Sequence, residues 1–215
     1  MALKEKLIRA KEVATFAHEG QLRDEGVPYI VHPANVVDIL KQIGCIEDPA
    51  VLAVGWLHDV VEDTHYTLEY VRKTFGKEIA FGVWLMTDNP DVSQRDRKAD
   101  TINRLRHYYH NKFAVVKLAD RLSNLSSMVT WNAKRKYKYA IGSLGILWAI
   151  SKTSCPQLWD ALFITVCSMV MPELEQDMFR NRKCCGCAKH RKTWWTGGHH
   201  YCMWCMKKRS VVKHK

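Results

Sequence analysis

The sequence predicts an all-α body over residues 1–179, followed by a short region of a different kind. Apolar residues recur at helical spacing through the body, and no strand-type alternation occurs before residue 180. The composition changes at Arg180, after which Gly, Cys, His, Trp and basic residues dominate. We therefore predict two domains, residues 1–179 and residues 180–215.

The first three predicted helices occupy residues 3–17, 32–43 and 49–59. The first has a single apolar stripe formed by Leu3, Leu7, Ala10, Val13, Ala14 and Ala17. The second begins at His32, where the next residue is a proline whose missing N–H is harmless in a first turn, and it ends at Gly44. The third begins at Asp48 and carries His58 and Asp59 at its C-terminal end.

Six further helices are predicted at residues 67–75, 78–87, 94–110, 112–129, 134–150 and 156–171. Gly76 separates the first two, and Asp120 lies in the fourth. The last two are the most apolar, but their apolar runs are shorter than the roughly 20 residues that a membrane span requires. We therefore expect no membrane partner. The charged N-terminus also lacks a signal-type apolar run, so we expect a cytoplasmic protein.

The charge of the chain is divided at the same point as its composition. The net charge is +11, and residues 180–215 contain eleven Lys and Arg residues and no acidic residue. The body is therefore neutral, as in an ordinary globular domain. The C-terminal region is predicted to be a separate unit with an anionic partner.

The pair His58-Asp59, with His32 before it and Asp120 after it, is the main chemical signal. Two imidazoles and two carboxylates bind a divalent metal and leave positions open for water, which indicates hydrolysis. Glu62 lies one helical turn beyond the pair, next to Asp63, and either carboxylate is suited to take a proton from water. Taken alone, Asp120 also fits a salt bridge and His58 a core histidine. The prediction therefore depends on the whole set.

Four motifs occur in order along the body: ATFAHEGQLRDEGVPYIVHP at residues 14–33, LHDVVEDT at 57–64, Phe75-Gly76, and VKLADRLSNL at 116–125. They resemble the hydrolase domain of RelA/SpoT-type alarmone (ppGpp) enzymes of the stringent response, a branch of the HD phosphohydrolase superfamily. The small single-domain members are the most similar. The resemblance covers about residues 1–150. It implies an HD-domain helical bundle that removes the 3′-pyrophosphate of guanosine tetra- and pentaphosphate, using one manganese ion (Mn²⁺).

The resemblance also implies roles for particular residues. The metal ligands would be His32, His58, Asp59 and Asp120, and the pair that positions and deprotonates water would be Glu62 and Asp63. The nucleotide would be contacted by Arg23 and Asn124, with Lys117, Arg97 and Lys98 along the path of the phosphates. His18 and Gln21 match the family too, and a structural hydrogen bond suits them at least as well as a catalytic role.

Two departures from the family pattern concern the substrate. Asp24 and Glu25 stand where a Lys-Ser-type pair is usual, and Ser123 and Ser126 stand where His and Arg are usual. Both changes are expected to remove donors from the nucleotide side of the site. They leave open an alternative substrate, such as the 2′-phosphate of NADPH. A further alternative is a nucleic-acid-binding module whose body senses a nucleotide.

The C-terminal region has a metal-binding pattern of its own. Cys184 and Cys187 form one C-x-x-C pair, and Cys202 and Cys205 form a second pair 14 residues later, a spacing that suits one tetrahedral zinc ion (Zn²⁺) in a ribbon or knuckle. Alternative ligands are Cys185, His190, His199 and His200. So short a region cannot bury a sufficient core, so metal binding is expected to drive its folding.

Basic residues around these cysteines are interleaved with Trp194, Trp195, Tyr201 and Trp204. Cations that meet phosphates and aromatic rings that stack on bases are typical of proteins that bind RNA, the ribosome or single-stranded nucleic acid. The alternative is that the rings form a small core and that the charges are a solvated face.

Overall fold

The computed structural model describes residues 2–178, 181–183, 190–196 and 199–202, and gives side-chain positions for residues 2–170. The chain divides into two compact units, Met1–Val166 and Cys167–Lys215, each considered by itself below. The first unit ends within a long helix. The predicted domain boundary at 179/180, which follows the change in composition, stays a prediction.

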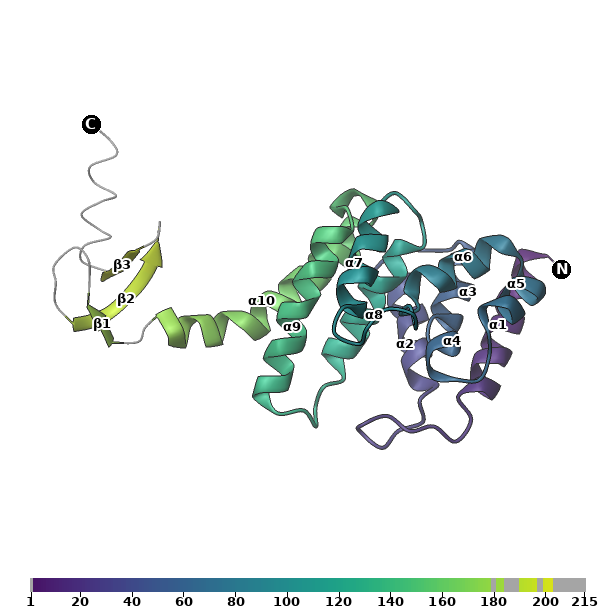
Figure 1. The fold of residues 1–215 in the computed structure, drawn as a ribbon, viewed down its shortest axis with the longest axis horizontal. Helices are drawn as coiled ribbons and strands as arrows, with labels where there is room; N and C mark the ends of the chain where they lie inside the picture. Colours follow the sequence, from purple (N-terminus) through teal and green to yellow (C-terminus); the bar gives the residue numbers. More distant parts are fainter. Residues whose placement is uncertain (1, 179–180, 184–189, 197–198, 203–215) are drawn as a thin grey trace. The chain divides into compact units, whose positions relative to one another are not determined.

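The first unit is built from helices, which confirms the all-α prediction for the body (Figure 1). Their bounds are α1 Leu3–Ala17, α2 Val31–Gln42, α3 Pro49–Leu57, α4 Val60–Asp63, α5 Leu68–Phe75, α6 Lys77–Met86, α7 Arg97–His107, α8 Ala114–Ser126, α9 Ala133–Ala149 and α10 Pro156–Met178. A short 3₁₀ turn at Lys152–Ser154 precedes α10, and one isolated bridge joins Leu22 to Pro28 in the α1–α2 loop.

Several helix ends differ from the prediction. The helices predicted over 94–110 and 112–129 are shorter at both ends, at Arg97–His107 and Ala114–Ser126. The third helix stops at Leu57, and a separate turn, α4, carries Glu62 and Asp63, so that His58 and Asp59 lie at the junction between the two helices. The last helix was predicted to end at residue 171 but continues to Met178. The extra residues include Glu173, Leu174, Glu175 and Gln176, which are good helix formers.

Helix α3 is the centre of the first unit. All eight residues from Ala50 to Leu57 are buried, and the helix packs against α1, α2, α6 and α8. A helix that is apolar on every side can be stable only when other helices surround it. Gly55 allows a close approach here, because a Cβ atom at this position would lie 3.0 Å from side-chain atoms of Leu40 and Val37 on α2. The α2–α3 contact brings His32, in the first turn of α2, close to His58, which directly follows α3.

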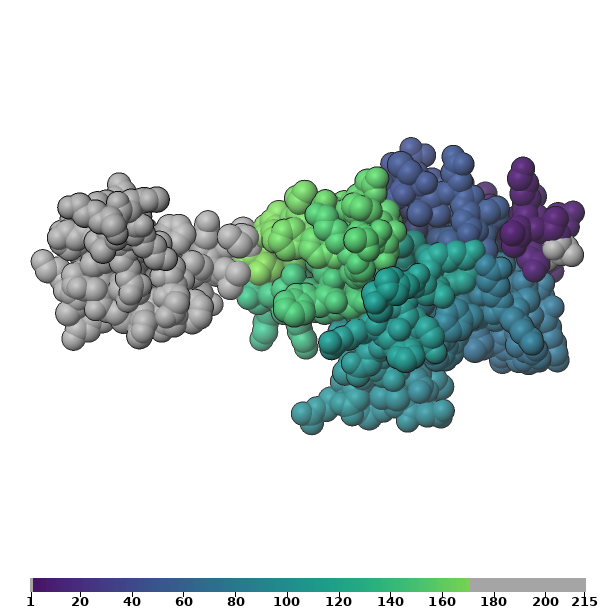
Figure 2. Space-filling view, turned by 90° about the horizontal axis from the view of Figure 1, so that it is seen from above, coloured from purple at the N-terminus to yellow at the C-terminus, as the bar shows by residue number. Residues whose placement is uncertain are grey.

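Helix α9 covers the other end of the first unit. It packs against α7 and α8 and begins at Asn132, whose side chain accepts a hydrogen bond from the backbone N–H of Arg135. In Figure 1 and Figure 2, α9 and the first part of α10 (green) lie at the end of this unit opposite α1 (purple). Helices α7, α8 and α9 together line the outer part of the cavity described below.

The second unit contains a three-stranded antiparallel sheet, β1 Asn181–Lys183, β2 His190–Thr196 and β3 His199–Cys202, in the order β1-β2-β3. Thr193 pairs with Cys202, and Thr196 with His199. Of the predicted zinc ligands, Cys184, Cys187 and Cys205 lie outside the described residues, so the zinc ribbon stays a prediction. Within the described part of the chain, no helix combines the length and the apolar character of a membrane span.

Candidate active site

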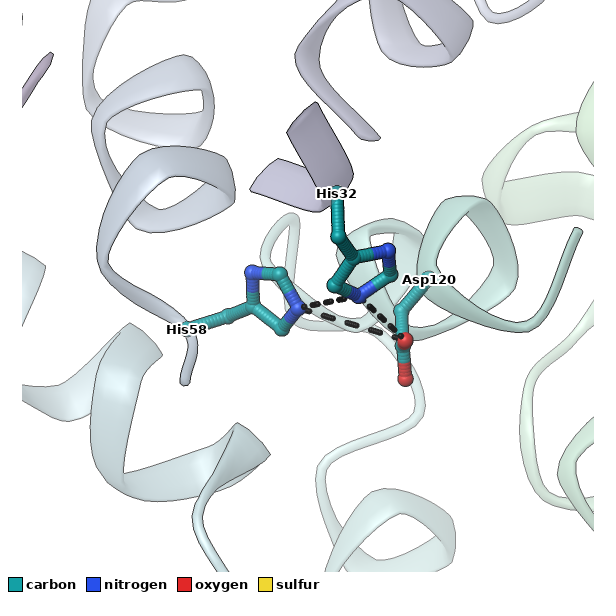
Figure 3. A group of neighbouring side chains, drawn as sticks. All are labelled: His32, His58 and Asp120. Atoms are coloured by element: carbon teal, nitrogen blue, oxygen red, sulfur yellow. Dashed lines mark hydrogen bonds and ion pairs between the residues drawn. The ribbon is translucent and has the colours of Figure 1, made fainter. Parts of the chain in front are cut away.

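Four side chains that are far apart in the sequence meet at one point in the first unit. His32 lies in the first turn of α2, His58 and Asp59 at the α3–α4 junction, and Asp120 within α8. The Nε2 atoms of the two histidines are 3.2 Å apart, and Oδ1 of Asp120 is 3.3 Å from Nε2 of His32 (Figure 3). Asp59 Oδ2 is 3.1 Å from His58 Nε2 and 3.5 Å from His32 Nε2. The sequence analysis predicted these four residues as one set.

The outer ring nitrogens of both histidines are fixed by neighbouring groups. Nδ1 of His58 donates to the carbonyl oxygen of Gly55 at 2.8 Å, and Nδ1 of His32 lies 3.1 Å from the hydroxyl of Ser123. A bond from Nδ1–H to a carbonyl leaves Nε2 as the acceptor nitrogen of a neutral ring. Gly55 therefore directs the lone pair of His58 Nε2 at the meeting point.

This arrangement fits a divalent metal ion. Ligand atoms of His32, His58 and Asp120 all lie within 4.8 Å of one another, and the three residues are buried. Two imidazole nitrogens that face each other at 3.2 Å repel unless a proton or a cation lies between them. Nitrogen and carboxylate oxygen donors together are typical of sites for Mn²⁺, Fe²⁺ or Zn²⁺.

Without a metal, the cluster holds a proton. Burial by itself would lower the pKa of His58, but the carboxylates of Asp59, 3.1 Å away, and Asp120 together outweigh burial and raise the pKa to about 9. Burial would likewise raise the pKa of Asp59, but His58 and His32 lower it. A metal ion and this proton compete for the same place.

Asp120 is held by two other groups on its own helix. Lys117 Nζ lies 3.1 Å from Asp120 Oδ2, and the amide of Asn124 donates to Oδ1 at 2.7 Å. Burial would raise the pKa of Asp120, but the Lys117 ammonium and the two imidazoles keep it well below its usual range. Lys117 and Asn124, predicted as nucleotide contacts, thus also orient a carboxylate of the cluster.

Glu62 and Asp63 are next to the cluster on α4. Glu62 Oε2 accepts a hydrogen bond from the backbone N–H of Asp88 at 3.0 Å. The hydroxyl of Tyr29 lies 2.7 Å from Asp63 Oδ2 and 2.9 Å from Asp59 Oδ2, and its single proton serves one of them at a time. Burial raises the pKa of both Glu62 and Asp63, which brings each closer to the range of a general base.

A cavity of about 470 Å³ connects the cluster to helices α7 and α9. Its wall combines carboxylates and His32 with other residues of α7, α8 and α9. The walls include Tyr29, His32, Asp59, Glu62, Asp63, Asp88, Lys98, Thr101, Ile102, Lys117, Asp120, Arg121, Asn124 and Tyr139. Its volume is in the usual range for sites that bind small molecules.

The predicted nucleotide contacts divide into two groups. Lys98, Lys117 and Asn124 line the cavity, but Arg23 and Arg97 do not. Arg23 donates to the side chains of Asn124 and Ser127, each at 3.0 Å, and Arg97 donates to the carbonyl of Val92. Contact between either arginine and a nucleotide therefore stays a prediction.

The four departures from the family pattern do not line the cavity, and the expectation that they remove donors from its nucleotide side stays a prediction. Asp24 accepts from Trp131 Nε1 and pairs with Arg135, both at 2.8 Å, and Glu25 pairs with Arg23. Ser123 and Ser126 line a separate hollow of about 390 Å³ between α2 and α8. Ser123 and Asp120, one turn apart on α8, contact opposite nitrogens of the His32 ring, Nδ1 and Nε2 respectively.

Sequence reasoning missed eight residues of the cavity wall: Tyr29, Asp88, Thr101, Ile102, Arg121, Tyr139, Gly142 and Ile146. Tyr29 lies between two carboxylates and stacks on His18, with ring centroids 4.5 Å apart. His18 in turn bonds to Gln21, which donates to the backbone carbonyl of Asp63. The sequence places Tyr29 only three residues before His32, which was a signal that it could lie near the site. The contact of its hydroxyl with Asp63, far away in the sequence, depends on the fold.

Comparison with known proteins identifies the same family as the sequence motifs do. The HD domain family matches residues 10–147, which is well over half of the chain. The mouse guanosine-3′,5′-bis(diphosphate) 3′-pyrophosphohydrolase MESH1 is 33% identical over 163 residues, covering 73% of this chain and 90% of the mouse protein. The Drosophila melanogaster protein of the same name is 34% identical over 144 residues, covering 63% of this chain and 79% of its own length.

Larger proteins also match, over a small part of their length. A GTP pyrophosphokinase of Streptomyces coelicolor is 38% identical over 141 residues, which is 64% of this chain but 16% of that protein. Among solved structures, one described as a metazoan ortholog of SpoT that hydrolyzes ppGpp superimposes with a TM-score of 0.69 at 29% identity. The match covers 76% of this chain and 94% of that one. The chain therefore belongs to the HD domain family, as a relative of these pyrophosphohydrolases.

Proposed function

We propose that the protein is a metal-dependent hydrolase that removes the 3′-pyrophosphate of guanosine tetra- and pentaphosphate. The observation that carries this proposal is the convergence of His32, His58, Asp59 and Asp120 on one point beside Glu62 and Asp63, at the end of an open cavity. The names of the MESH1 relatives support the choice of substrate.

The metal we propose is a single Mn²⁺ ion held by His32, His58, Asp59 and Asp120. Carboxylate-rich sites with two imidazoles suit this ion. When bound, a divalent ion supplies positive charge that polarises a phosphoryl oxygen and lowers the pKa of water. A pyrophosphate group carries several negative charges, and the carboxylates of the wall would otherwise repel it.

Glu62 and Asp63 have the proton-accepting role in this proposal. Their raised pKa values make them better bases than exposed carboxylates, and both are held in place, Glu62 by the N–H of Asp88 and Asp63 by Tyr29. Lys117 balances the charge of Asp120, so that the cluster does not carry the full charge of its carboxylates. No nucleophilic Ser or Cys is required, because phosphoryl transfer depends mainly on positioning and electrostatics.

The alternative of a different nucleotide, such as the 2′-phosphate of NADPH, was motivated by Asp24, Glu25, Ser123 and Ser126. All four lie outside the cavity wall, and this substrate stays the alternative. For residues 180–215, we retain the proposal of one structural Zn²⁺ held by Cys184, Cys187, Cys202 and Cys205. The excess of basic and aromatic residues there supports binding to RNA or single-stranded nucleic acid.

The test is to incubate the purified protein with guanosine tetraphosphate and Mn²⁺, and to separate the products. Release of pyrophosphate that a chelator abolishes would support the proposal. If Mn²⁺ binds but no pyrophosphate is released, while NADPH loses phosphate, the assigned substrate is wrong. Glu62→Gln provides the matched control, since it removes the proposed base but keeps the size of the side chain.

A further inference from the structure

The loop between α1 and α2 contains a charged network that the proposed function does not use. Residues 22–28 form a small hairpin, closed at its base by an isolated bridge. At its tip, the N–H of Gly26 donates to the carbonyl oxygen of Arg23 at 2.9 Å, and Gly26 has a φ of +79°, which favours glycine. This turn carries Asp24 and Glu25, the acidic pair that departs from the family pattern.

The guanidinium of Arg23 is held by three side chains. Nη2 donates to Oδ1 of Asn124 and to Oγ of Ser127, each at 3.0 Å. Nε donates to Oε2 of Glu25 at 3.3 Å, and the two members of this ion pair are only 12% and 16% exposed. These bonds use three of the five N–H groups of a guanidinium. Arg23 is therefore directed at Asn124, and it does not line the cavity.

Asn124 connects Arg23 to the cluster. Its Nδ2 donates to Oδ1 of Asp120 at 2.7 Å, and the same oxygen lies 3.3 Å from Nε2 of His32. An amide side chain has an acceptor and a donor at its two ends, and rotation by half a turn exchanges them. Because the oxygen of Asn124 accepts from Arg23, the NH₂ group stays on the side of Asp120. Arg23 thus acts on a proposed metal ligand through a second residue.

Asp24 anchors the tip of the hairpin. Its Oδ2 accepts from Nε1 of Trp131 and pairs with Arg135, both at 2.8 Å. The guanidinium carbon of Arg135 lies 3.6 Å from the centre of the Trp131 ring, so the three side chains contact one another. The hairpin that carries Arg23 is therefore attached to the segment between α8 and α9 at a second point.

We propose that Glu25 and Arg23 are positioning residues: Glu25 holds Arg23 on Asn124, and Arg23 thereby orients the proposed metal ligand Asp120. The inference rests on the proposed function, in which the cluster binds a divalent ion. Bonds of this kind fix the orientation of a ligand before the metal arrives. An acidic residue beside Arg23 is unfavourable for a polyphosphate but favourable when its partner is the guanidinium itself. Arg23 then has a role that requires no nucleotide.

The test is the affinity for Mn²⁺, measured by calorimetry without nucleotide. Arg23→Met is expected to weaken Mn²⁺ binding by about 10-fold, the usual effect of losing a supporting bond. The direction of the change is decisive, because removing a positive charge near a cation site would by itself strengthen binding. Unchanged or tighter binding would overturn the proposal. Arg106→Met is the matched control, since Arg106 is exposed on α7, and it should not weaken binding.

A double-mutant cycle with Asn124→Ala tests the route of the effect. If Arg23 acts through Asn124, then Arg23→Met should weaken Mn²⁺ binding no further once Asn124 has been replaced by Ala. Losses that simply add would show that Arg23 acts on the cluster by another route, and the proposal would fail.

Glu25→Gln keeps the test informative even if Arg23→Met does not fold, because it preserves the size of the side chain. We expect it to weaken Mn²⁺ binding by about 5-fold, the equivalent of one hydrogen bond. Glu19→Gln is the matched control, since Glu19 is exposed in the same loop and its replacement removes the same charge. Equal affinities in the two variants would overturn the role of Glu25.

The result is separate from that of the proposed function, because Mn²⁺ affinity does not depend on which nucleotide is hydrolysed. If the wild-type protein binds Mn²⁺ but releases no pyrophosphate from guanosine tetraphosphate, the proposed substrate is wrong, and weaker binding in Arg23→Met still supports the positioning role. If wild type and Arg23→Met bind Mn²⁺ equally, the positioning role is wrong, even where guanosine tetraphosphate is hydrolysed.

Discussion

The two parts of the chain are expected to use their proposed metal ligands in opposite ways. In the first unit, His32, His58, Asp59 and Asp120 are attached to helices whose apolar faces are already buried around α3. In residues 180–215, the paired cysteines lie in a segment too short to bury a comparable core. The metal is therefore expected to serve chemistry in the body and folding in the C-terminal region. A helical core can place charged ligands at a fixed point before any metal arrives, whereas a short Cys-rich segment cannot.

Asp59→Ala should have the largest effect. It removes a proposed metal ligand and the partner of His58, so we expect kcat/KM for guanosine tetraphosphate to fall by about 10³-fold or more, the equivalent of several kcal/mol. The helical fold should remain, because α3 is packed independently of this side chain. Circular dichroism checks the fold, and exposed Asp91→Ala is the control. Full activity in Asp59→Ala would contradict the metal site in the body.

Cys202→Ser should act on the other part of the chain alone. We expect the purified protein to lose about one equivalent of zinc, because a tetrahedral site needs all four ligands. Metal content measured by mass spectrometry gives the result, and hydrolysis by the body should be unchanged. Exposed Cys45→Ser is the control. If Cys202→Ser keeps its zinc and Asp59→Ala loses it, the assignment of metals to the two regions is wrong.

Ser123→Ala should give an intermediate effect in the body. The hydroxyl of Ser123 contacts Nδ1 of His32, and loss of such a supporting bond typically weakens metal affinity about 10- to 100-fold. Titration with Mn²⁺ followed by calorimetry measures this. Ser126→Ala is matched to it, since Ser126 lies on the same helix but donates to the carbonyl of Leu122. Equal affinities in the two variants would show that Ser123 does not orient His32.

Asp48→Ala should have the smallest effect, and it tests whether the body is stable without metal. Asp48 accepts a hydrogen bond from the N–H of Ala50 at the start of α3, and loss of such a cap costs about 1 kcal/mol. We expect Tm to fall by about 2–4 °C in metal-free and metal-loaded protein alike. A fall confined to the metal-loaded form would contradict a core that is independent of the metal.

The contribution of Asp48 should also depend on pH. Burial would raise the pKa of Asp48, but Lys112, 2.7 Å away, lowers it overall. A carboxylate with a lowered pKa stabilises the fold above its unfolded pKa of about 3.9, and this stabilisation is lost as the pH falls through the lower folded value. The difference in Tm between wild type and Asp48→Asn, which can still cap the helix, should therefore shrink below about pH 4.

The sequence was sufficient for most helices of the body and for the four side chains that meet at one point. Regular apolar spacing fixes a helix locally, so α1 was predicted with its observed ends, and Gly76, at φ +91°, separates α5 from α6 as expected. The separate turn α4 could not be foreseen. Its break at His58-Asp59 carries no glycine or proline, the usual signals of a helix end.

The sequence by itself determined which residues can bind a metal and take up a proton, because those properties belong to the side chains. Only the tertiary structure decided which of them face one cavity. Ser123 and Asp120 are three residues apart, yet Asp120 lines the cavity and Ser123 lies behind His32. The hydroxyl oxygen of Tyr29 lies 2.7 Å from Oδ2 of Asp63, although the two residues are 34 positions apart in the sequence. Distances of this kind are set by how α2, α3 and α8 pack together, and packing depends on every buried side chain at once.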